Sequence, residues 1–151
     1  MPVTSIETRH SHTTWLSPQV SDTDYGGGVY HGRYFAIYNQ ARDQFISDMG
    51  FPYQDLMAQG LHLAVAQINC QYLLPIRYAE KIKISSRVSW YRSKSLGMVQ
   101  KMESHDGQTI RNRMEINLVC VDSSGASVVL PQKLTRAIDQ YHTRSDKTKK
   151  R

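Results

Sequence analysis

The sequence predicts an α+β domain in which one long amphipathic helix packs against an antiparallel sheet. Residues 33–49 place apolar side chains along one face of a helix of period 3.6. Residues 82–130 then alternate apolar and polar side chains between turn-forming sequences, which is typical of successive half-buried strands. One helix followed by such strands agrees with a helix wrapped by a curved sheet.

The helix is expected to begin at Arg33 and to end near Met49, because Gly50 and Pro52 supply a stop signal. Residues 61–72 follow and are apolar in both alternating phases, which predicts a central strand covered on both faces. The apolar stripe of the helix consists of Tyr34, Ile37, Tyr38, Ala41, Phe45 and Met49.

Three further strands follow with their turns. Residues 82–90 form the first, and the turn at 92–95 leads into the second at 96–103. Asp106-Gly107 predicts a tight hairpin before the third strand, over residues 110–120.

Length and composition indicate one domain of 151 residues, 40% of them apolar. We expect a loose leader at 1–12, a folded domain at 13–140 and a basic, disordered tail at 141–151. No apolar run is long enough to cross a membrane, and the first ten residues lack the apolar core of a secretion signal. The sequence therefore predicts a cytoplasmic protein.

Most of the net charge lies at the C-terminus. The chain carries +6, and residues 144–151 contain five basic residues and one acidic residue. A short basic segment without aromatic residues is usually solvated, so we expect no nucleic-acid partner. The segment could still be attracted weakly to an anionic membrane surface.

The two cysteines, Cys70 and Cys120, lie in apolar strand-like runs without CxxC spacing. This favours buried free thiols over a disulfide or a metal site. Neither cysteine has the electropositive surroundings that activate a nucleophile. We therefore expect no metal and no cofactor.

The chemically richest segment is residues 22–31, Asp-Thr-Asp-Tyr-Gly-Gly-Gly-Val-Tyr-His. Two carboxylates, two phenols and an imidazole flank three glycines, which allow backbone N–H groups to approach a ligand closely. The segment leads into the expected helix N-terminus, where unpaired N–H groups and the helix dipole favour negative charge. The alternative is an ordinary polar turn in which His31 only caps or packs.

This segment resembles the 4-hydroxybenzoyl-CoA thioesterase family of hotdog-fold proteins, and most of all the acyl-CoA thioesterases of the bacterial Tol–Pal cluster. The resemblance covers about Thr13 to Ile138. It implies a hotdog fold, in which a curved antiparallel sheet wraps a long central helix. The further matching segments are Tyr34, Tyr38-Asn39-Gln40-Ala41-Arg42, Gly50-Phe51-Pro52-Tyr53-Gln54-Asp55-Leu56, Cys120-Val121-Asp122 and Leu130-Pro131.

Two positions depart from the family pattern. The family helix usually carries a Glu where Asn39 stands, which puts any role of that Glu in doubt. Arg33 occupies a position that is often small and polar, which predicts a more basic site.

The resemblance implies a metal-free acyl-thioester hydrolase with Asp24 as base or nucleophile, helped by partial desolvation of its carboxylate. Amides around Tyr30 and His31 would hold the oxyanion. His31 would bond the thioester oxygen, position the water or protonate the leaving thiolate; the alternative is a buried imidazole that pins the loop. Asp22 is expected to orient the loop.

The substrate-binding candidates surround the same segment. Tyr25 would narrow the acyl pocket, Gly27 would offer its backbone, and Tyr30 and Tyr34 would line the pocket unless they only pack in the core. Lys94-Ser95, in a turn, would contact the phosphate or pantetheine of coenzyme A or the matching part of an acyl carrier protein. The other basic candidates, which are more often solvated strand-face charges, are Arg77, Arg87, Arg92, Arg111 and Arg113.

Two other functions stay open at this level. Asp24 and His31 could serve a hydratase or dehydratase that acts on a β-hydroxyacyl thioester, or Asn39 could mark a non-catalytic module that binds acyl carriers. The apolar faces of the strands predict a homo-oligomer, dimeric or tetrameric, with the site near the subunit boundary.

Overall fold

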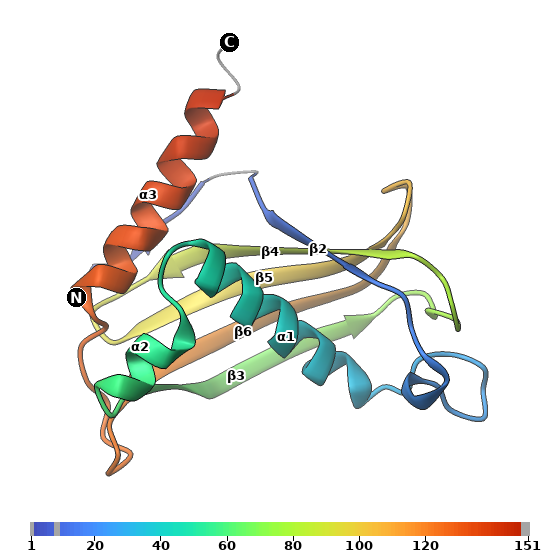
Figure 1. Cartoon of the computed structure of the whole chain (residues 1–151), viewed down its shortest axis with the longest axis horizontal. Coiled ribbons are helices and arrows are strands. Elements are labelled where there is room, and N and C mark those ends of the chain that lie inside the picture. Colours follow the sequence, from blue (N-terminus) through green and yellow to red (C-terminus); the bar gives the residue numbers. More distant parts are fainter. Residues whose placement is uncertain (1, 8–9, 149–151) are drawn as a thin grey trace.

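The computed structural model describes residues 2–7 and 10–148, with side chains as far as Thr143. One six-stranded antiparallel sheet has the order β1-β4-β5-β6-β3, and β2 also pairs with β4. Figure 1 shows α1 lying across one face of this sheet, so the α+β architecture is confirmed. The elements are β1 (Thr4–Ser5), β2 (His12–Leu16), the 3-10 turn η1 (Val20–Asp22), α1 (Arg33–Asp48), α2 (Tyr53–Ala58), β3 (His62–Tyr72), β4 (Ile82–Tyr91), β5 (Ser95–Ser104), β6 (Ile110–Val121) and α3 (Gln132–Thr148).

Helix α1 forms where the apolar stripe predicts it, and its buried face builds the core. Tyr38 and Phe45 have no exposed surface, and the sheet faces them with side chains such as Met98 and Met114. The chain leaves the helix through Gly50, whose φ of +93° favours glycine. The helix is therefore fixed along its length, and its N-terminus has a defined place beside the sheet.

The predicted strands at 82–90, 96–103 and 110–120 are confirmed as β4, β5 and β6. The hairpin between the last two turns at Gly107, with a φ of +73° and an N–H that donates to Ser104 O at 2.8 Å. Period-2 patterning succeeds here because each strand has one face on α1 and the core.

The prediction of a central, doubly covered strand at residues 61–72 is wrong. β3 is an edge strand, paired with β6 on one side, and Val65 within it is 54% exposed. Apolar residues in both alternating phases favour a strand whose two faces are covered, but they do not show whether that strand lies at the centre or at the edge of the sheet. The exposed apolar side chains of β3 have no cover among the described residues.

The ends of the chain also differ from the expectation. β1, within the predicted leader, pairs with β4. Helix α3 packs on the core through Leu134 and Ile138 and continues into the predicted disordered tail as far as Thr148. Residues 149–151 lie outside the described residues, and so do the side chains of the basic segment from 144 onward. Within the described part of the chain, no helix has the length and apolar character needed to cross a bilayer.

Candidate active site

The 22–31 loop is a small hairpin that precedes α1. Asp24 N–H donates to Gly28 O at 3.0 Å, and Gly27 N–H donates to Asp24 O at 3.1 Å, which closes a tight turn. Gly27 has a φ of +80°, in the left-handed region that favours glycine. Val29 N–H donates to Ile76 O at 2.7 Å, so the base of the loop is docked on the segment between β3 and β4.

Asp22 anchors the start of the loop to the residues on either side of it. Its carboxylate is 5% exposed and accepts hydrogen bonds from Gln19 N–H at 2.8 Å and from Arg33 Nε–H at 2.6 Å. The backbone donor of Gln19, and then Arg33, hold the pKa of Asp22 below its ordinary value although burial opposes them. Asp22 therefore orients the loop, as expected, while Arg33 is paired and does not make the site more basic.

Asp24 lies at the turn with its side chain exposed. One carboxylate oxygen accepts Gly26 N–H at 2.8 Å, and the other has no hydrogen-bond partner among the described residues. The turn thus fixes the orientation of the carboxylate and leaves one oxygen open to water or substrate. The desolvation expected for this group is not present in the single chain and would have to come from substrate or from a second copy.

His31 stands next to the helix with its side chain exposed, so the alternative of a buried, pinning imidazole is wrong for the single chain. Its ring centroid lies 4.4 Å from that of Tyr30. Its carbonyl oxygen accepts a hydrogen bond from Tyr72 Oη at 2.7 Å, which ties the helix start to the end of β3. No hydrogen bond joins Asp24 to His31 within the part of the chain that the structure describes.

The helix start narrows the choice of oxyanion donors. Tyr30 N–H already donates to Asp22 O at 2.8 Å, so the expectation that this amide holds an oxyanion is wrong for this loop conformation. The amides of His31 and Gly32 have no acceptor among the described residues, and the N-cap residue Gly32 makes no side-chain capping bond. These two amides therefore remain as donors at the positive end of the α1 dipole.

A cavity of about 260 Å³ opens beside this helix start. Tyr34 forms one wall with 3% of its surface exposed, and its ring meets that of Tyr72 edge-on at 5.0 Å. Burial raises the pKa of Tyr34. The remaining walls are apolar and come from Val29, Leu73, Leu74 and Pro75. The cavity offers an apolar space beside Tyr72, whose hydroxyl contacts the His31 carbonyl at the start of α1.

The structure does not bring all predicted residues together. Tyr25 is fully exposed at the loop tip and lines no part of this cavity, so the expected narrowing is wrong for the single chain. Lys94 precedes β5 and Ser95 is its first residue, and both neighbour the last residues of β6. The 22–31 loop instead lies beside the last residues of β3, which pair with the first residues of β6. Lys94 and Ser95 therefore sit at the opposite end of the sheet (Figure 1).

The sequence did not indicate that Tyr72 belongs to the site, and it gave no reason to prefer Arg77 over the other basic candidates. Arg77 is exposed, and its Nη1 lies 3.6 Å from where a Cβ on Gly27 would be, so it is the cation beside the loop. Arg111 is also near but pairs with Glu80 at 3.0 Å. The strand pattern could not reveal Tyr72, because its role depends on β3 ending beside the helix start.

Neither cysteine joins the exposed chemistry of the loop. Cys70 and Cys120 are both free thiols; Cys120 is buried as predicted, whereas Cys70 is only partly buried, and burial raises the pKa of Cys120. Among the described side chains, which end at Thr143, no three His, Cys, Asp or Glu residues are grouped so that they could hold a metal ion. The chemistry available in the loop is that of a carboxylate, an imidazole and backbone amides.

Comparison with known proteins places this geometry in a family. A family model described as the thioesterase-like superfamily matches residues 18–138. The chain belongs to this superfamily. The acyl-CoA thioester hydrolase YbgC of Escherichia coli O6:H1 is 34% identical over 101 residues, which are 67% of this chain and 75% of that protein.

Solved structures share the fold. A 1,4-dihydroxy-2-naphthoyl-CoA thioesterase from Synechocystis superposes with a TM-score of 0.79 at 16% identity, covering 86% of this chain and 96% of that chain. A hypothetical protein of Staphylococcus aureus, in complex with CoA, superposes with a TM-score of 0.81 at 15% identity, covering 89% of this chain and 85% of that chain. The predicted hotdog fold is thus confirmed, and family membership supports the predicted thioester hydrolase.

Proposed function

We propose that this protein hydrolyses acyl-CoA thioesters at the junction of the 22–31 loop and α1. The proposal rests on the loop and helix start together: the turn orients the Asp24 carboxylate and leaves one of its oxygens open, and the amides of His31 and Gly32 have no acceptor among the described residues. The adjacent apolar cavity walled by Tyr34 has room for part of an acyl group. Family relatives named as acyl-CoA thioester hydrolases support the same class of substrate.

The reaction follows from these groups. The oxygen of a water molecule attacks the thioester carbonyl carbon, and the Asp24 carboxylate accepts a proton from that water. The carbonyl oxygen becomes an oxyanion, which the amides of His31 and Gly32 stabilise together with the helix dipole. The carbon–sulfur bond then breaks, and the thiolate takes up the proton, from Asp24 or through His31. The products are a free carboxylic acid and coenzyme A.

The direct test is thiol release from a panel of short, long and aromatic acyl-CoA substrates. Asp24→Asn should lower kcat by about a thousandfold, as loss of a positioned base does, with little change in stability. Asp122→Asn is the matched control, because Asp122 also accepts a turn amide, from Ser124 at 2.9 Å, but at the far end of β6. An Asp24→Asn protein that retains most of its thiol release would remove Asp24 from the mechanism.

We infer that the active form is a homo-oligomer built on the free edge of β3. The edge strand presents unpaired backbone groups together with exposed apolar side chains, including Val65 and Tyr72. A second copy paired antiparallel to β3 would cover them. Its 22–31 loop would then lie at the His62 end of the first copy, the same end of the joint sheet as Lys94 and Ser95.

Light scattering at micromolar concentration tests this assembly. We expect at least a dimeric mass, and a Val65→Lys variant should shift the protein toward monomer because it places a charge on the edge. A monomeric mass for the unaltered protein would contradict the inference.

Arg77 is the cation that we propose for the phosphates of coenzyme A, since it is exposed beside Gly27. Arg77→Gln should raise KM for acyl-CoA severalfold while kcat stays nearly constant. If an acyl carrier protein is the true thiol carrier, the same variant should weaken turnover of the carrier-bound substrate more than that of acyl-CoA. We further infer a cytoplasmic site of action, which two free thiols and a CoA substrate both suit.

A further inference from the structure

Arg42 is a buried cation that no carboxylate neutralises. Its side chain lies between α1 and the sheet with 9% of the residue exposed. Nη1–H donates to Gln100 Oε1 at 2.9 Å, and Nη2–H donates to Asn39 Oδ1 at 3.1 Å. Both acceptors are neutral amides, and no Asp or Glu lies within ion-pair distance of Arg42 in the described part of the chain.

This buried, unneutralised guanidinium lowers the stability of the folded single chain. Burial lowers the pKa of Arg42 to about 10, and no neighbouring charge opposes that change. A buried guanidinium without a carboxylate is destabilising unless another group supplies the missing negative charge. Gln100 is itself held in place, because its Nε2 donates to Tyr38 O at 3.0 Å and to Ser86 Oγ at 2.9 Å. Gln100 therefore holds the Arg42 guanidinium in one position.

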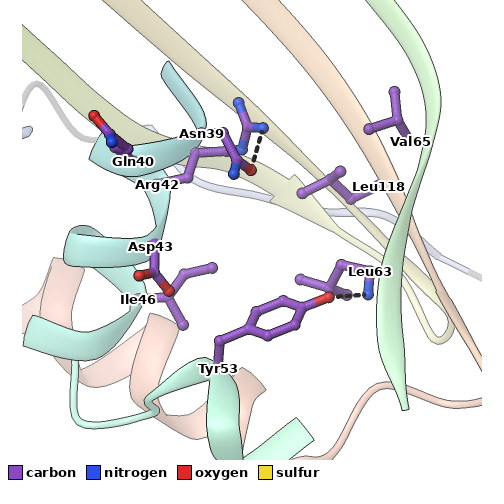
Figure 2. Close-up of a pocket in the computed structure, with 9 residues that line it drawn as sticks. All are labelled: Asn39, Gln40, Arg42, Asp43, Ile46, Tyr53, Leu63, Val65 and Leu118. Atoms are coloured by element: carbon purple, nitrogen blue, oxygen red, sulfur yellow. Dashed lines mark hydrogen bonds between the residues drawn. The ribbon is translucent and has the colours of Figure 1, made fainter. Parts of the chain in front are cut away.

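The guanidinium lines a cavity of about 340 Å³ between α1 and β3. Figure 2 shows Arg42 and Asn39 on the helix side, facing Leu118 and Val65 across the space, while Tyr53 closes the end near Leu63. The wall opposite the helix is apolar. The helix side also carries Asn39, Gln40 and the carboxylate of Asp43. Asp43 is exposed to solvent, whereas Arg42 is buried, so a ligand that has a hydrocarbon chain and one anionic group suits this space.

We propose that this cavity is an acyl subsite in which Arg42 binds the terminal carboxylate of an ω-carboxyacyl thioester, a proposal that rests on the thioesterase function above. A planar carboxylate matches the fork of a guanidinium. The phosphates of coenzyme A fit less well, because they would carry several charges into a space with apolar walls on its sheet side.

The location suits the far end of an acyl group. Arg42 lies nine residues after Arg33, or roughly 14 Å along the helix axis from the start of α1. The 260 Å³ cavity and the 340 Å³ cavity both lie along the seam between α1 and β3, one near each end of β3. An acyl group that follows this seam from a reacting thioester would bring its distal carboxylate to the guanidinium.

The test compares ω-carboxyacyl-CoA with unbranched acyl-CoA of the same carbon number: glutaryl with pentanoyl, adipyl with hexanoyl, suberyl with octanoyl and sebacyl with decanoyl. We expect kcat/KM to favour the ω-carboxy substrate at one or more lengths by about tenfold or more. Arg42→Gln should abolish that preference, and Arg42→Lys should keep part of it. Free adipate, but not hexanoate, should raise the melting temperature of the unaltered protein.

A second variant guards against loss of folding in the Arg42 series. Asn39→Asp is nearly isosteric and places a carboxylate where Asn39 Oδ1 already accepts from Arg42, so it should cancel the preference while Arg42 stays in place. Gln54→Glu adds the same charge at an exposed position of α2 outside the cavity and should leave the preference intact.

The possible results either support the Arg42 subsite or overturn it. Equal or better turnover of the neutral partner at every length, with no effect of adipate, overturns the subsite and leaves the thioesterase function standing. No hydrolysis of any acyl-CoA, with Arg42-dependent stabilisation by adipate, overturns the proposed function and supports the subsite. Arg42-dependent stabilisation by coenzyme A alone assigns the cation to a phosphate and overturns the proposal. A preference that persists in Asn39→Asp overturns it as well.

Discussion

Asp22→Asn should destabilise the protein and should do so in a pH-dependent way. The two oxygens of Asp22 accept separate hydrogen bonds, from Gln19 N–H and from Arg33 Nε–H. An amide offers a single acceptor oxygen, so in the variant one of these donors faces an NH2 group. The loss therefore includes one charge-assisted hydrogen bond and one unfavourable contact between donors.

The size of the effect follows from the burial of the partners. Hydrogen bonds to charged groups contribute about 1.5 to 3 kcal/mol, but the Arg33 side chain is 46% exposed, and solvent screens its share. We expect a loss of about 2 kcal/mol at pH 7. Because the folded pKa of Asp22 lies below its ordinary value of 3.8, this stabilisation is complete above that value. It disappears as pH falls through the lower folded pKa.

Urea unfolding of both proteins, from pH 7 down to about pH 3, measures the difference. With a slope near 2 kcal/mol per molar urea, the variant midpoint should lie roughly 1 M lower at pH 7. The gap should begin to close below the ordinary pKa. Asp43→Asn, whose carboxylate makes no ion pair among the described residues, is the control. Equal midpoints at pH 7, or a gap that is unchanged at low pH, would refute the reasoning.

Two further predictions concern the site and the C-terminus. Tyr72→Phe removes the hydroxyl that donates to His31 O but keeps the ring beside Tyr34, so kcat should fall about tenfold with a small change in melting temperature; unchanged kcat would show that the contact is not needed. The wild-type donor should persist in alkaline assays, because burial and Cys70 raise the pKa of Tyr72 to about 12. Deleting residues 144–151 should leave acyl-CoA turnover unchanged and weaken any salt-sensitive binding to anionic vesicles. Loss of turnover in that deletion would mean that residues 144–151 are needed for the reaction.

The sequence predicted the elements whose patterning is local. Helix α1 and strands β4 to β6 each show their buried face in the spacing of apolar residues, so their positions could be derived within a few residues. The edge position of β3 could not, because hydrophobic alternation is the same for a central strand and for an edge strand that a partner covers. Helix α3 was missed because its apolar positions, such as Leu134 and Ile138, are few among polar and charged residues.

The candidate site was predictable to the same degree. Asp24 and His31 stand on one short loop, so their proximity follows from the sequence alone. Lys94 was misplaced because a turn between strands can lie at either end of a sheet, and the register of β5 on β6 decides which. The isolation of Arg42 was also invisible, since it depends on Gln100, which is remote in sequence and offers an amide where a carboxylate could have stood.

In the oligomer proposed above, the hydrogen bond from Tyr72 to the His31 carbonyl links the site to protein concentration. Tyr72 is the last residue of the free-edge strand, so a second copy that orders this edge also orders the start of α1. By mass action, activity per protomer should fall on dilution below the dissociation constant of the pair. By reciprocity, a substrate that binds the ordered site more tightly must strengthen the association of the copies by the same factor.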